Sequence, residues 1–371
     1  MRLDLKSLFR HDTVPLLGID ISTSSVRLVE LAPAGKRGLR LERCACESLP
    51  DGAVSNGNIE QTELVSQALH RVWKNSGART RNVALCMPAA SVITKKILLP
   101  AGLLDAELEA YMDAEAGQYL PFALDDMSFD FAVLGAAPDA PGEIEVMLAA
   151  TRRDKVEQRV ALAAAAGLTA LVMEVESYAA RAALARAILS RQSAQPVASR
   201  QNMVALCQIG AGLTHFSVLQ GGRAIHESES AFGGKLLTQE IGRAYQMTLE
   251  EAEARKHSAD LPDDYHEAIL LPFIDSAALE IGRAIELFSL AHAKNKAKDH
   301  PRLDALYLAG GCALIPGLSQ LLAERCNIPC AVAWPFEGMR VAPSLASTPG
   351  ALRSGAAASL VACGLALRRF G

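Results

Sequence analysis

The pattern of apolar and polar positions is most regular in two stretches that follow the same plan. Residues 16–31 (LLGIDISTSSVRLVEL) contain an apolar strand, a turn of four hydroxyl residues and a second strand. Residues 203–222 (MVALCQIGAGLTHFSVLQGG) contain an apolar strand, a glycine-rich turn and a second strand. Each pattern is typical of a β-hairpin. Because one such hairpin opens each half of the chain, we expect a duplicated fold with a ligand-binding cleft between its halves.

Between the hairpins, the apolar periodicity predicts a mixture of strands and helices. The stretch 172–189 is typical of an Ala-rich helix entered from a strand, with Glu174 and Glu176 in its first turn. Strand, helix, two strands and helix over 90–171 predict an inserted α+β unit, which is either a structural elaboration or a partner-binding site. Strands are expected at 39–47, 83–87, 92–98, 128–134 and 144–150, and helices at 60–75, 105–119 and 154–166.

The second half of the chain is more helical. A polar segment at 190–201 marks the boundary between two lobes, and the second hairpin follows it. A strand at 303–309 leads directly into Gly310-Gly311, where paired glycines let a ligand approach the backbone closely. Helices are expected from the pair Gly233-Gly234, at 248–256 and at 267–294.

Composition limits the classes of protein to consider. The chain has 371 residues, 50% hydrophobic and 21% charged, as expected for a globular protein with two lobes. Its net charge of −4, without a basic stripe interleaved with aromatic residues, argues against a nucleic-acid-binding protein. No secretory signal is evident, and the longest weakly polar run, 355–367, is too short to span a bilayer. We therefore expect a soluble, cytoplasmic protein whose eight cysteines are reduced core thiols.

Asp20 is the first residue that suggests chemistry, because a carboxylate in a buried strand is costly without a use. Followed by hydroxyl and backbone N–H groups, it could hold a phosphate through a hard ion such as Mg²⁺. The alternative is an ordinary hairpin whose Asp hydrogen-bonds its own turn. In the second hairpin Gln208 falls where Asp20 sits, and Gly210 where Ser22 sits. Two such turns facing each other could hold the phosphates of one nucleotide.

Two helix starts offer further candidates. Glu176 either orients a water near the terminal phosphate or is simply favoured there by the helix dipole. The pair Gly233-Gly234 opens a helix, and a helix N-terminus is a ready site for an anion.

In this order, the two hairpins, the acidic helix start and the strand ending in Gly-Gly resemble the actin–Hsp70–hexokinase superfamily. Within it, the chain is similar to the PilM family of type IV pilus assembly proteins, which is related to the cell-division protein FtsA. The similarity covers essentially residues 14–371 and implies an α/β, duplicated actin-like (ribonuclease H-like) two-lobe fold with an inserted α+β subdomain. It is carried by GIDISTSSVRLVEL (18–31), EAGQYLPFALDDMSFDFAVLG (115–135), EVESYAARAALAR (174–186), FGGKLLTQEI (232–241) and LVACGLALR (360–368).

The resemblance also implies domain boundaries along the chain. Residues 1–13 would be an N-terminal arm, and the insertion at 90–171 would replace the usual actin subdomain. The remaining parts would be a first-lobe core at 14–89, 172–200 and 355–371, a second-lobe core at 201–238 and 301–354, and a helical subdomain at 239–300.

For the ligand, the resemblance implies ATP or ADP with Mg²⁺, and Asp20 would contact the metal through water. Gln208 departs from the family pattern, in which an Asp is usual, and predicts weakened metal binding and at most slow ATP hydrolysis, with Glu176 as the water-orienting residue. The cofactor-binding residues would be Asp20, Ser22, Ser24, Ser25 and Arg27 in the first phosphate loop, Gln208, Gly210, Gly212 and Thr214 in the second, Gly233, Gly234 and Lys235 at the helix start, Glu253 and Lys256 at the ribose, and Gly310, Gly311 and Ala313 at the adenosine.

The implied function is an ATP-binding scaffold of the type IV pilus inner-membrane assembly complex. Its partners would be other pilus assembly components and a PilN-like membrane protein, whose cytoplasmic N-terminus would enter a groove beside the insertion. No amphipathic helix follows the last segment, so the protein would lie at the inner membrane only through a partner. The alternatives are an FtsA-like division filament and, with no spare Asp evident as a base, a small-molecule kinase.

Overall fold

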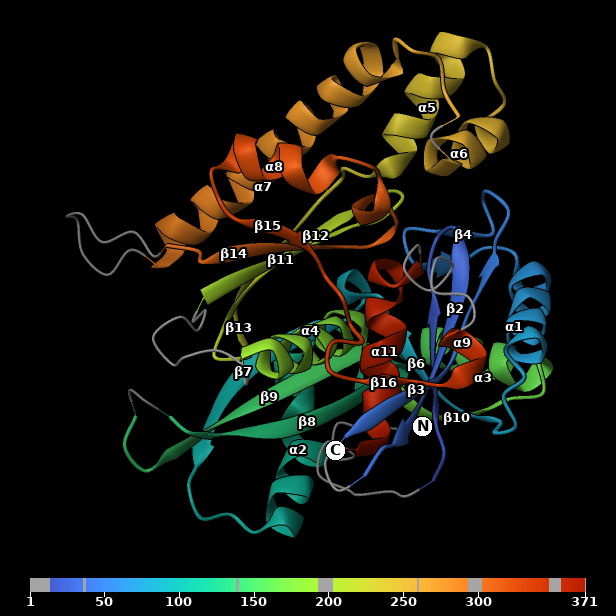
Figure 1. Cartoon of the computed structure of the whole chain (residues 1–371). Coiled ribbons are helices and arrows are strands. Elements are labelled where there is room, and N and C mark those ends of the chain that lie inside the picture. The colour runs from blue at the N-terminus through green and yellow to red at the C-terminus, as the bar shows by residue number, and fades with distance from the viewer. Residues whose placement is uncertain are drawn as a thin grey trace. The chain divides into compact units, whose positions relative to one another are not determined.

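A computed structural model of the chain describes residues 14–35, 38–137, 140–192, 203–258, 260–292, 302–346 and 355–370. The predicted arm at 1–13 and residues 193–201 of the predicted linker lie outside the described residues. The chain forms two compact units (Figure 1). The first unit comprises Met1–Ala32, Arg43–Ala179 and Val361–Gly371, and the second comprises Pro33–Glu42 and Ala180–Leu360.

The larger sheet of the first unit is built around the first hairpin. Strand β1 (Leu17–Ile21) runs antiparallel to β2 (Ser25–Pro33) and parallel to β6 (Asn82–Met87), which in turn pairs in parallel with β10 (Thr169–Val175). All five residues of β1 are buried, as expected for a central strand with helices on its faces. The other elements of this unit's main body are β3 (Leu39–Ser48) from Arg43 onward, β4 (Val54–Ser55), β5 (Asn58–Ile59), α1 (Thr62–Ser76), α3 (Arg153–Ala165), the start of α4 (Glu176–Gln192) and α11 (Leu360–Leu367) from Val361 onward.

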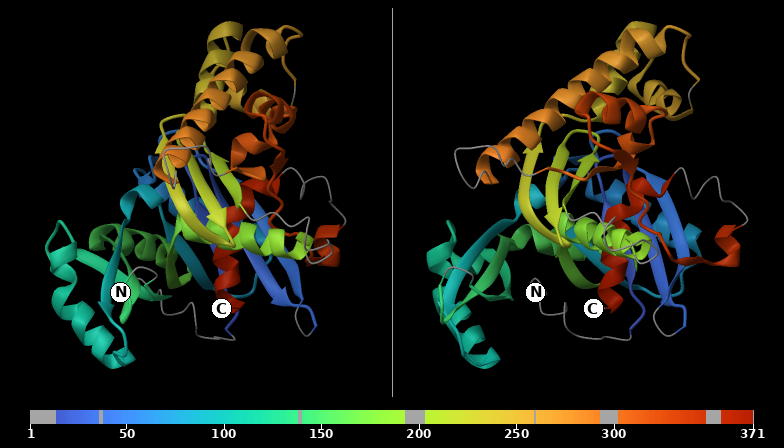
Figure 2. Two further views of the ribbon diagram at one scale, coloured as in Figure 1. Left: turned by 90° about the vertical axis from the view of Figure 1, so that its left-hand side faces the viewer. Right: turned by 60° about the vertical axis from the view of Figure 1, so that its left-hand side comes forward.

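The inserted unit has its own sheet and core. Strands β7 (Ile93–Pro100), β9 (Glu143–Arg152) and β8 (Met127–Ala136) form an antiparallel sheet, and α2 (Asp105–Tyr119) covers one face of it (Figure 2). Apolar side chains of α2, such as Met112, pack in one cluster with those of the sheet, such as Leu148. Helix α3 and strand β10 pack instead in the cluster of the larger sheet, although both overlap the 90–171 range predicted for the insertion.

The second unit repeats the hairpin plan. Strand β11 (Met203–Ile209) is antiparallel to β12 (Thr214–Gln220) and parallel to β14 (Ala305–Ala309), and the sheet order is β13-β12-β11-β14-β15. Helices α7 (Leu271–His292) and α8 (Leu318–Cys326) cover one face (Figure 1). The other elements are β13 (Arg223–Ser230), β15 (Cys330–Val332), β16 (Arg340–Val341), α5 (Gly234–Tyr245), α6 (Leu249–Ser258), the π-turn His266–Leu270 that leads into α7, α9 (Pro343–Ala346) and the 3₁₀ turn Gly311–Leu314.

One prediction about the first unit is wrong. Glu174 does not lie in the first turn of a helix, because β10 continues to Val175 and α4 begins at Glu176. The parallel pairing of Glu174 with Cys86 holds this residue in the sheet. Its buried carboxylate is matched by Arg368, whose Nε lies 3.2 Å from Oε2. A sheet interior tolerates a carboxylate when an opposite charge accompanies it.

Two further sequence expectations can be compared with the structure. The eight cysteines are free thiols, as predicted, but they are not all core residues: Cys86, Cys207, Cys312 and Cys363 are buried, whereas Cys46 is exposed. Among the described helices, none combines the length and the apolar character needed to cross a membrane.

Candidate functional site

The first turn is held together by its own hydroxyl groups. Ser22 N donates to Ser25 O at 2.9 Å, and the Ser22 hydroxyl donates to the same carbonyl at 3.0 Å. From the opposite strand, Arg27 Nη1 donates to Ser22 Oγ at 3.2 Å. Ser24 is exposed at the tip and its carbonyl accepts from Leu49 N at 2.9 Å. The turn is therefore a closed, rigid polar loop with a guanidinium group against it.

Asp20 lies just behind this turn and is only 5% exposed. It faces Arg27 in the register of the hairpin, and the Cys86 thiol approaches its Oδ1 at 4.0 Å. Burial raises the pKa of Asp20, while the positive charges of Arg27 and Arg159 act in the opposite direction. The carboxylate is thus surrounded by the protein's own cations and is nearly closed to solvent.

Arg159 is a residue that the sequence analysis missed. It lies on α3, is 3% exposed, and its Nη2 donates to Gly57 O at 2.8 Å. Burial lowers the pKa of Arg159, and the negative charges of its neighbours, including Glu176 and Asp20, oppose that effect. Glu176, the predicted water-orienting residue, is half-buried, and its charge acts on the same guanidinium as that of Asp20. Periodicity places Arg159 on α3 but gives no sign that this helix packs against β6 and β10.

The second turn is held by the glycine pair rather than by side chains. Gly210 N donates to Leu213 O across the turn, and the carbonyl groups of the turn accept from Gly234 N at 2.9 Å and Lys235 N at 2.8 Å. A Cβ atom on Gly233 would lie 2.5 Å from Ala211 O, so only glycine allows this approach. The N–H groups of Gly234 and Lys235 are therefore engaged within the protein. They do not support the anion-binding role that we predicted for this helix start.

Thr214 and Lys256 complete the inner side of this loop cluster. Thr214 Oγ1 donates to Phe232 O at 2.8 Å, which ties β12 to the glycine pair. Lys256, with a side chain only 3% exposed, donates to Thr238 Oγ1 at 2.9 Å and forms an ion pair with Glu253. The ammonium charge is therefore balanced within the protein by Glu253, and its protons go to Gly234 O, Thr238 Oγ1 and Glu253. The predicted Glu253 and Lys256 thus lie together beside Gly234.

The strand that ends in Gly-Gly joins the same cluster. Gly310 has φ of +85°, and a Cβ there would lie 2.4 Å from Ile209 O. Cys312 Sγ donates to Gly210 O at 3.6 Å, and Ala313 is buried beside it. Around Gly311, by contrast, an added Cβ would meet no atom within 4 Å. The backbone at Gly311 is therefore open to a ligand, whereas Gly310 serves the packing of two loops.

Each unit therefore gathers its own share of the predicted residues. In the second unit, residues from three separate segments meet around the second turn, with Gln208 at the end of β11 and Gly212 exposed in the turn. In the first unit, Asp20 and the serine turn meet with Arg159 and Glu176. The first unit presents serine hydroxyls beside the Arg27 guanidinium, and the second unit presents open backbone at Gly311. Taken separately, these features suit an anionic or polar group. They suit a divalent cation less well, because the one predicted acidic ligand is flanked by two guanidinium groups.

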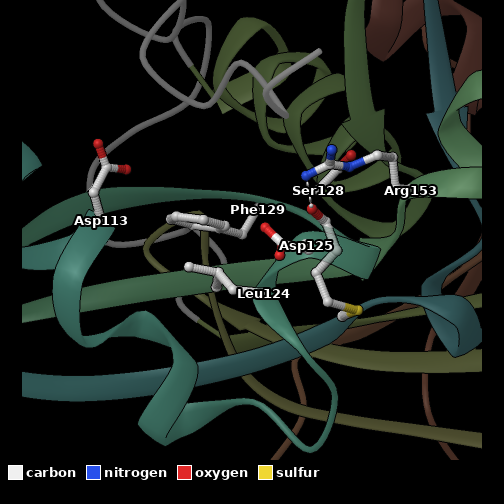
Figure 3. A pocket seen from close by; sticks show the side chains of 7 residues that line it. Asp113, Leu124, Asp125, Ser128, Phe129 and Arg153 are labelled. Carbon is white, nitrogen blue, oxygen red and sulfur yellow. Dashed lines mark hydrogen bonds between the residues drawn. The ribbon is translucent and has the colours of Figure 1, made fainter.

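The inserted unit contains a separate hollow of about 260 Å³, which the sequence did not reveal. It lies where β8 begins, between α2 and the start of α3, and Arg153 Nη2 donates to Met127 O at 3.2 Å at its side. Figure 3 shows Asp113 on one side and Arg153 on the other, with Phe129 and Asp125 between them. Apolar side chains with charged residues of both signs are suited to a short peptide segment.

The two hairpin-based sheets, each with a polar or glycine-rich turn at its loop cluster, define an actin-like protein. Comparison with known proteins makes the assignment specific. The family model described as type IV pilus assembly protein PilM matches residues 18–370, so the chain belongs to this family.

Two solved structures show the same fold. The first is described as a PilM–PilN type IV pilus biogenesis complex; the chain shares 24% identity with it over 97% of its own length and 100% of the other, with a TM-score of 0.78. The second is the ethanolamine utilization protein EutJ from Carboxydothermus hydrogenoformans, with 16% identity over 95% of this chain and 89% of the other, and a TM-score of 0.50. The predicted actin-like fold and the family resemblance are thereby confirmed.

Proposed function

We propose that this protein is a nucleotide-binding scaffold of the type IV pilus inner-membrane assembly complex. In this role it binds ATP or ADP at its loop clusters and the cytoplasmic N-terminus of a PilN-like membrane protein at the inserted unit. The observation that carries the proposal is the match of the PilM family model to residues 18–370. This match favours the pilus scaffold over the two alternatives, a division filament and a small-molecule kinase. We further propose that the protein reaches the inner membrane through its partner, and that the predicted domain boundaries describe its subdomains once α3 and β10 are counted with the first-lobe core.

The nucleotide part of the proposal is supported by the second unit. The buried ammonium of Lys256, the hydroxyl of Thr238 and the open backbone at Gly311 lie within one cluster of loops around the second turn. The backbone at Gly311 has room for a ligand, and the half-exposed Glu253 carboxylate offers it a hydrogen-bond acceptor. Gln208 provides no negative charge for a metal, and we therefore propose slow or absent hydrolysis. Because two guanidinium groups act on Asp20, we propose that nucleotide binding does not require Mg²⁺.

The partner part of the proposal is supported by the hollow in the inserted unit. The structure described as a PilM–PilN complex has the same fold as this chain. Asp113 and Asp125 are exposed at the hollow and attract a basic peptide residue, while Leu124 and Phe129 supply apolar contacts. A peptide that combines a basic residue with apolar ones matches this lining.

The test is a titration of the purified protein with a synthetic peptide of the PilN-like cytoplasmic N-terminus, with and without ATP. Saturable binding that shifts with nucleotide supports a coupled scaffold, because a nucleotide changes partner binding only if it favours one conformation. Binding that ignores the nucleotide indicates a static adaptor. A protein that binds neither the peptide nor ATP contradicts the proposal.

A matched pair of variants localises the peptide site. Asp125→Asn removes a carboxylate from the hollow, and we expect peptide binding to weaken by about 3–10-fold, the range for one charged contact at a partly exposed interface. Asp105→Asn removes an exposed carboxylate from α2 outside the hollow and should leave binding unchanged. Equal effects of the two substitutions would place the peptide elsewhere.

A further inference from the structure

The buried charges behind the first turn carry an inference that rests on the proposed nucleotide binding and deepens it. We propose that Arg159 is a positioning residue: its guanidinium supplies from inside the protein the positive charge that balances Asp20 and Glu176. As a consequence, the first turn accepts a nucleotide phosphate with little dependence on a divalent cation.

Arg159 is held in place by the fold and not by a ligand. Its helix, α3, packs through Val156 and Leu162 in the core cluster of the larger sheet. The side chain crosses to the loop before β5, where Nη2 donates to Gly57 O at 2.8 Å. Because only 3% of the residue is exposed, solvent does not screen the charge of the guanidinium. A permanent cation is therefore built into the protein beneath the first turn.

The groups that face Arg159 are mainly acidic. Asp20 comes from β1, Glu176 from the start of α4, and both interact with the guanidinium through charge. Cys86 on β6 lies among them, and the negative charges of Asp20 and Glu176 add to burial in raising the pKa of its thiol well above the usual range. The thiol is therefore neutral and adds no charge. A buried carboxylate without a nearby cation would be costly, so Arg159 makes this arrangement possible.

The charges at the turn itself then balance. Two carboxylates, Asp20 and Glu176, are matched by two guanidinium groups, Arg159 below the turn and Arg27 against it. A phosphate that approaches the serine hydroxyls therefore meets no net negative charge. In a site with unbalanced carboxylates, a divalent cation has to supply that compensation. Here Arg27 and Arg159 supply that compensation from the protein itself.

The experiment measures the dissociation constant of ATP by calorimetry on the full chain, once with MgCl₂ and once with EDTA. For the unmodified protein, we expect the dissociation constant of ATP to differ by no more than about threefold between the two conditions. In EDTA, the Arg159→Gln protein should bind ATP about tenfold or more weakly than the unmodified protein. With MgCl₂, it should recover most of the lost affinity. Arg159→Lys, which keeps the charge, should stay close to the unmodified protein in EDTA.

The control is Arg152→Gln, which removes an exposed arginine that precedes the same helix and pairs with Asp154. It should leave both constants unchanged. If the unmodified protein loses more than about 30-fold of its ATP affinity in EDTA, the inference is overturned, although the proposed nucleotide binding still stands. The inference is also overturned if the ratio of the ATP dissociation constants in EDTA and in MgCl₂ is the same for Arg159→Gln and for the unmodified protein. A protein that binds no ATP in either condition refutes the nucleotide part of the proposed function, and this inference with it.

A second measurement covers the case in which Arg159→Gln is too unstable to titrate. If Arg159 balances Asp20, then Asp20→Asn should raise the melting temperature of the Arg159→Gln protein, because the uncompensated charge is gone. The same change in the unmodified background should not raise it. Equal effects of Asp20→Asn in both backgrounds would show that Arg159 acts only through its bond to Gly57, and would overturn the inference.

Discussion

The ion pair between Glu174 and Arg368 gives a quantitative test of the first unit. The two side chains are 4% and 6% exposed, and Glu174 Oε1 also accepts from Val175 N at 2.9 Å. Arg368→Met would leave the carboxylate buried without its cation, and removal of one partner from a buried pair costs about 3–5 kcal/mol. In a unit of this size each kcal/mol lowers the melting temperature by about 2–4 °C, which gives a total of about 6–20 °C.

The assay needs a signal from the first unit alone. Of the two tryptophans, Trp73 lies on α1 in the first unit and Trp334 in the second. In a Trp334→Phe background, fluorescence of Trp73 during urea unfolding therefore reports the first unit. The neighbouring Arg369 donates to Leu31 O at 3.1 Å from a half-buried position, so Arg369→Met serves as the control and should cost about 1 kcal/mol.

A double substitution distinguishes the pair from ordinary packing. Glu174→Gln keeps the acceptor for Val175 N and removes the charge, so Glu174→Gln with Arg368→Met should recover most of the lost stability. The interaction energy from this cycle should exceed about 2 kcal/mol. Additive losses from the two single changes would refute the reasoning.

Other predictions concern both units. Glu227 and Glu229 outweigh the effect of burial and raise the pKa of His215 to about 9. The stabilising contribution of His215 is therefore complete below about pH 6.5 and is lost as the pH rises through about 9. The urea midpoint should fall across this pH range for the unmodified protein but not for His215→Gln. Gly234→Ala would place a Cβ 2.4 Å from a sulfur atom and should lower the free energy of unfolding by about 1–3 kcal/mol, whereas Gly311→Ala in open space should not. Gly364→Ala would place a Cβ 1.8 Å from a backbone oxygen of α4, and we expect it to abolish soluble expression.

The elements that the sequence predicted well are those defined by local pattern. Both hairpins, the helix at 105–119 and the three strands of the inserted sheet follow from alternation and turn residues within a few positions. In the second unit, the turn at 210–212 and the pairs Gly233-Gly234 and Gly310-Gly311 were noticed from their glycines, whereas Glu253 and Lys256 were named only through the family resemblance. The short edge strands β15 and β16 were missed, because two or three residues give no periodic signal.

The errors and omissions share a physical cause, which is that distant residues decide them. Glu174 looks like a favourable first-turn carboxylate until its pairing with Arg368, almost 200 positions later, is known. Arg159 looks like one of several charges on an ordinary helix, and only the packing of α3 against the larger sheet shows its relation to Asp20. The N–H groups at the start of α5 look free, and only the fold shows that the second turn already uses them.

The close fit of α11 in the first unit has a consequence for biosynthesis. Gly18 of β1 lies against the backbone of α11, where a Cβ would come within 2.0 Å of Ala362 O. The first unit therefore needs residues 361–371 to close its core, whereas every segment of the second unit has been translated once residue 360 is made. On the ribosome, the unit that begins first can be completed only last. A chain truncated after residue 360 should therefore contain a folded second unit beside an unfinished first one, which is exposed to chaperones and proteases.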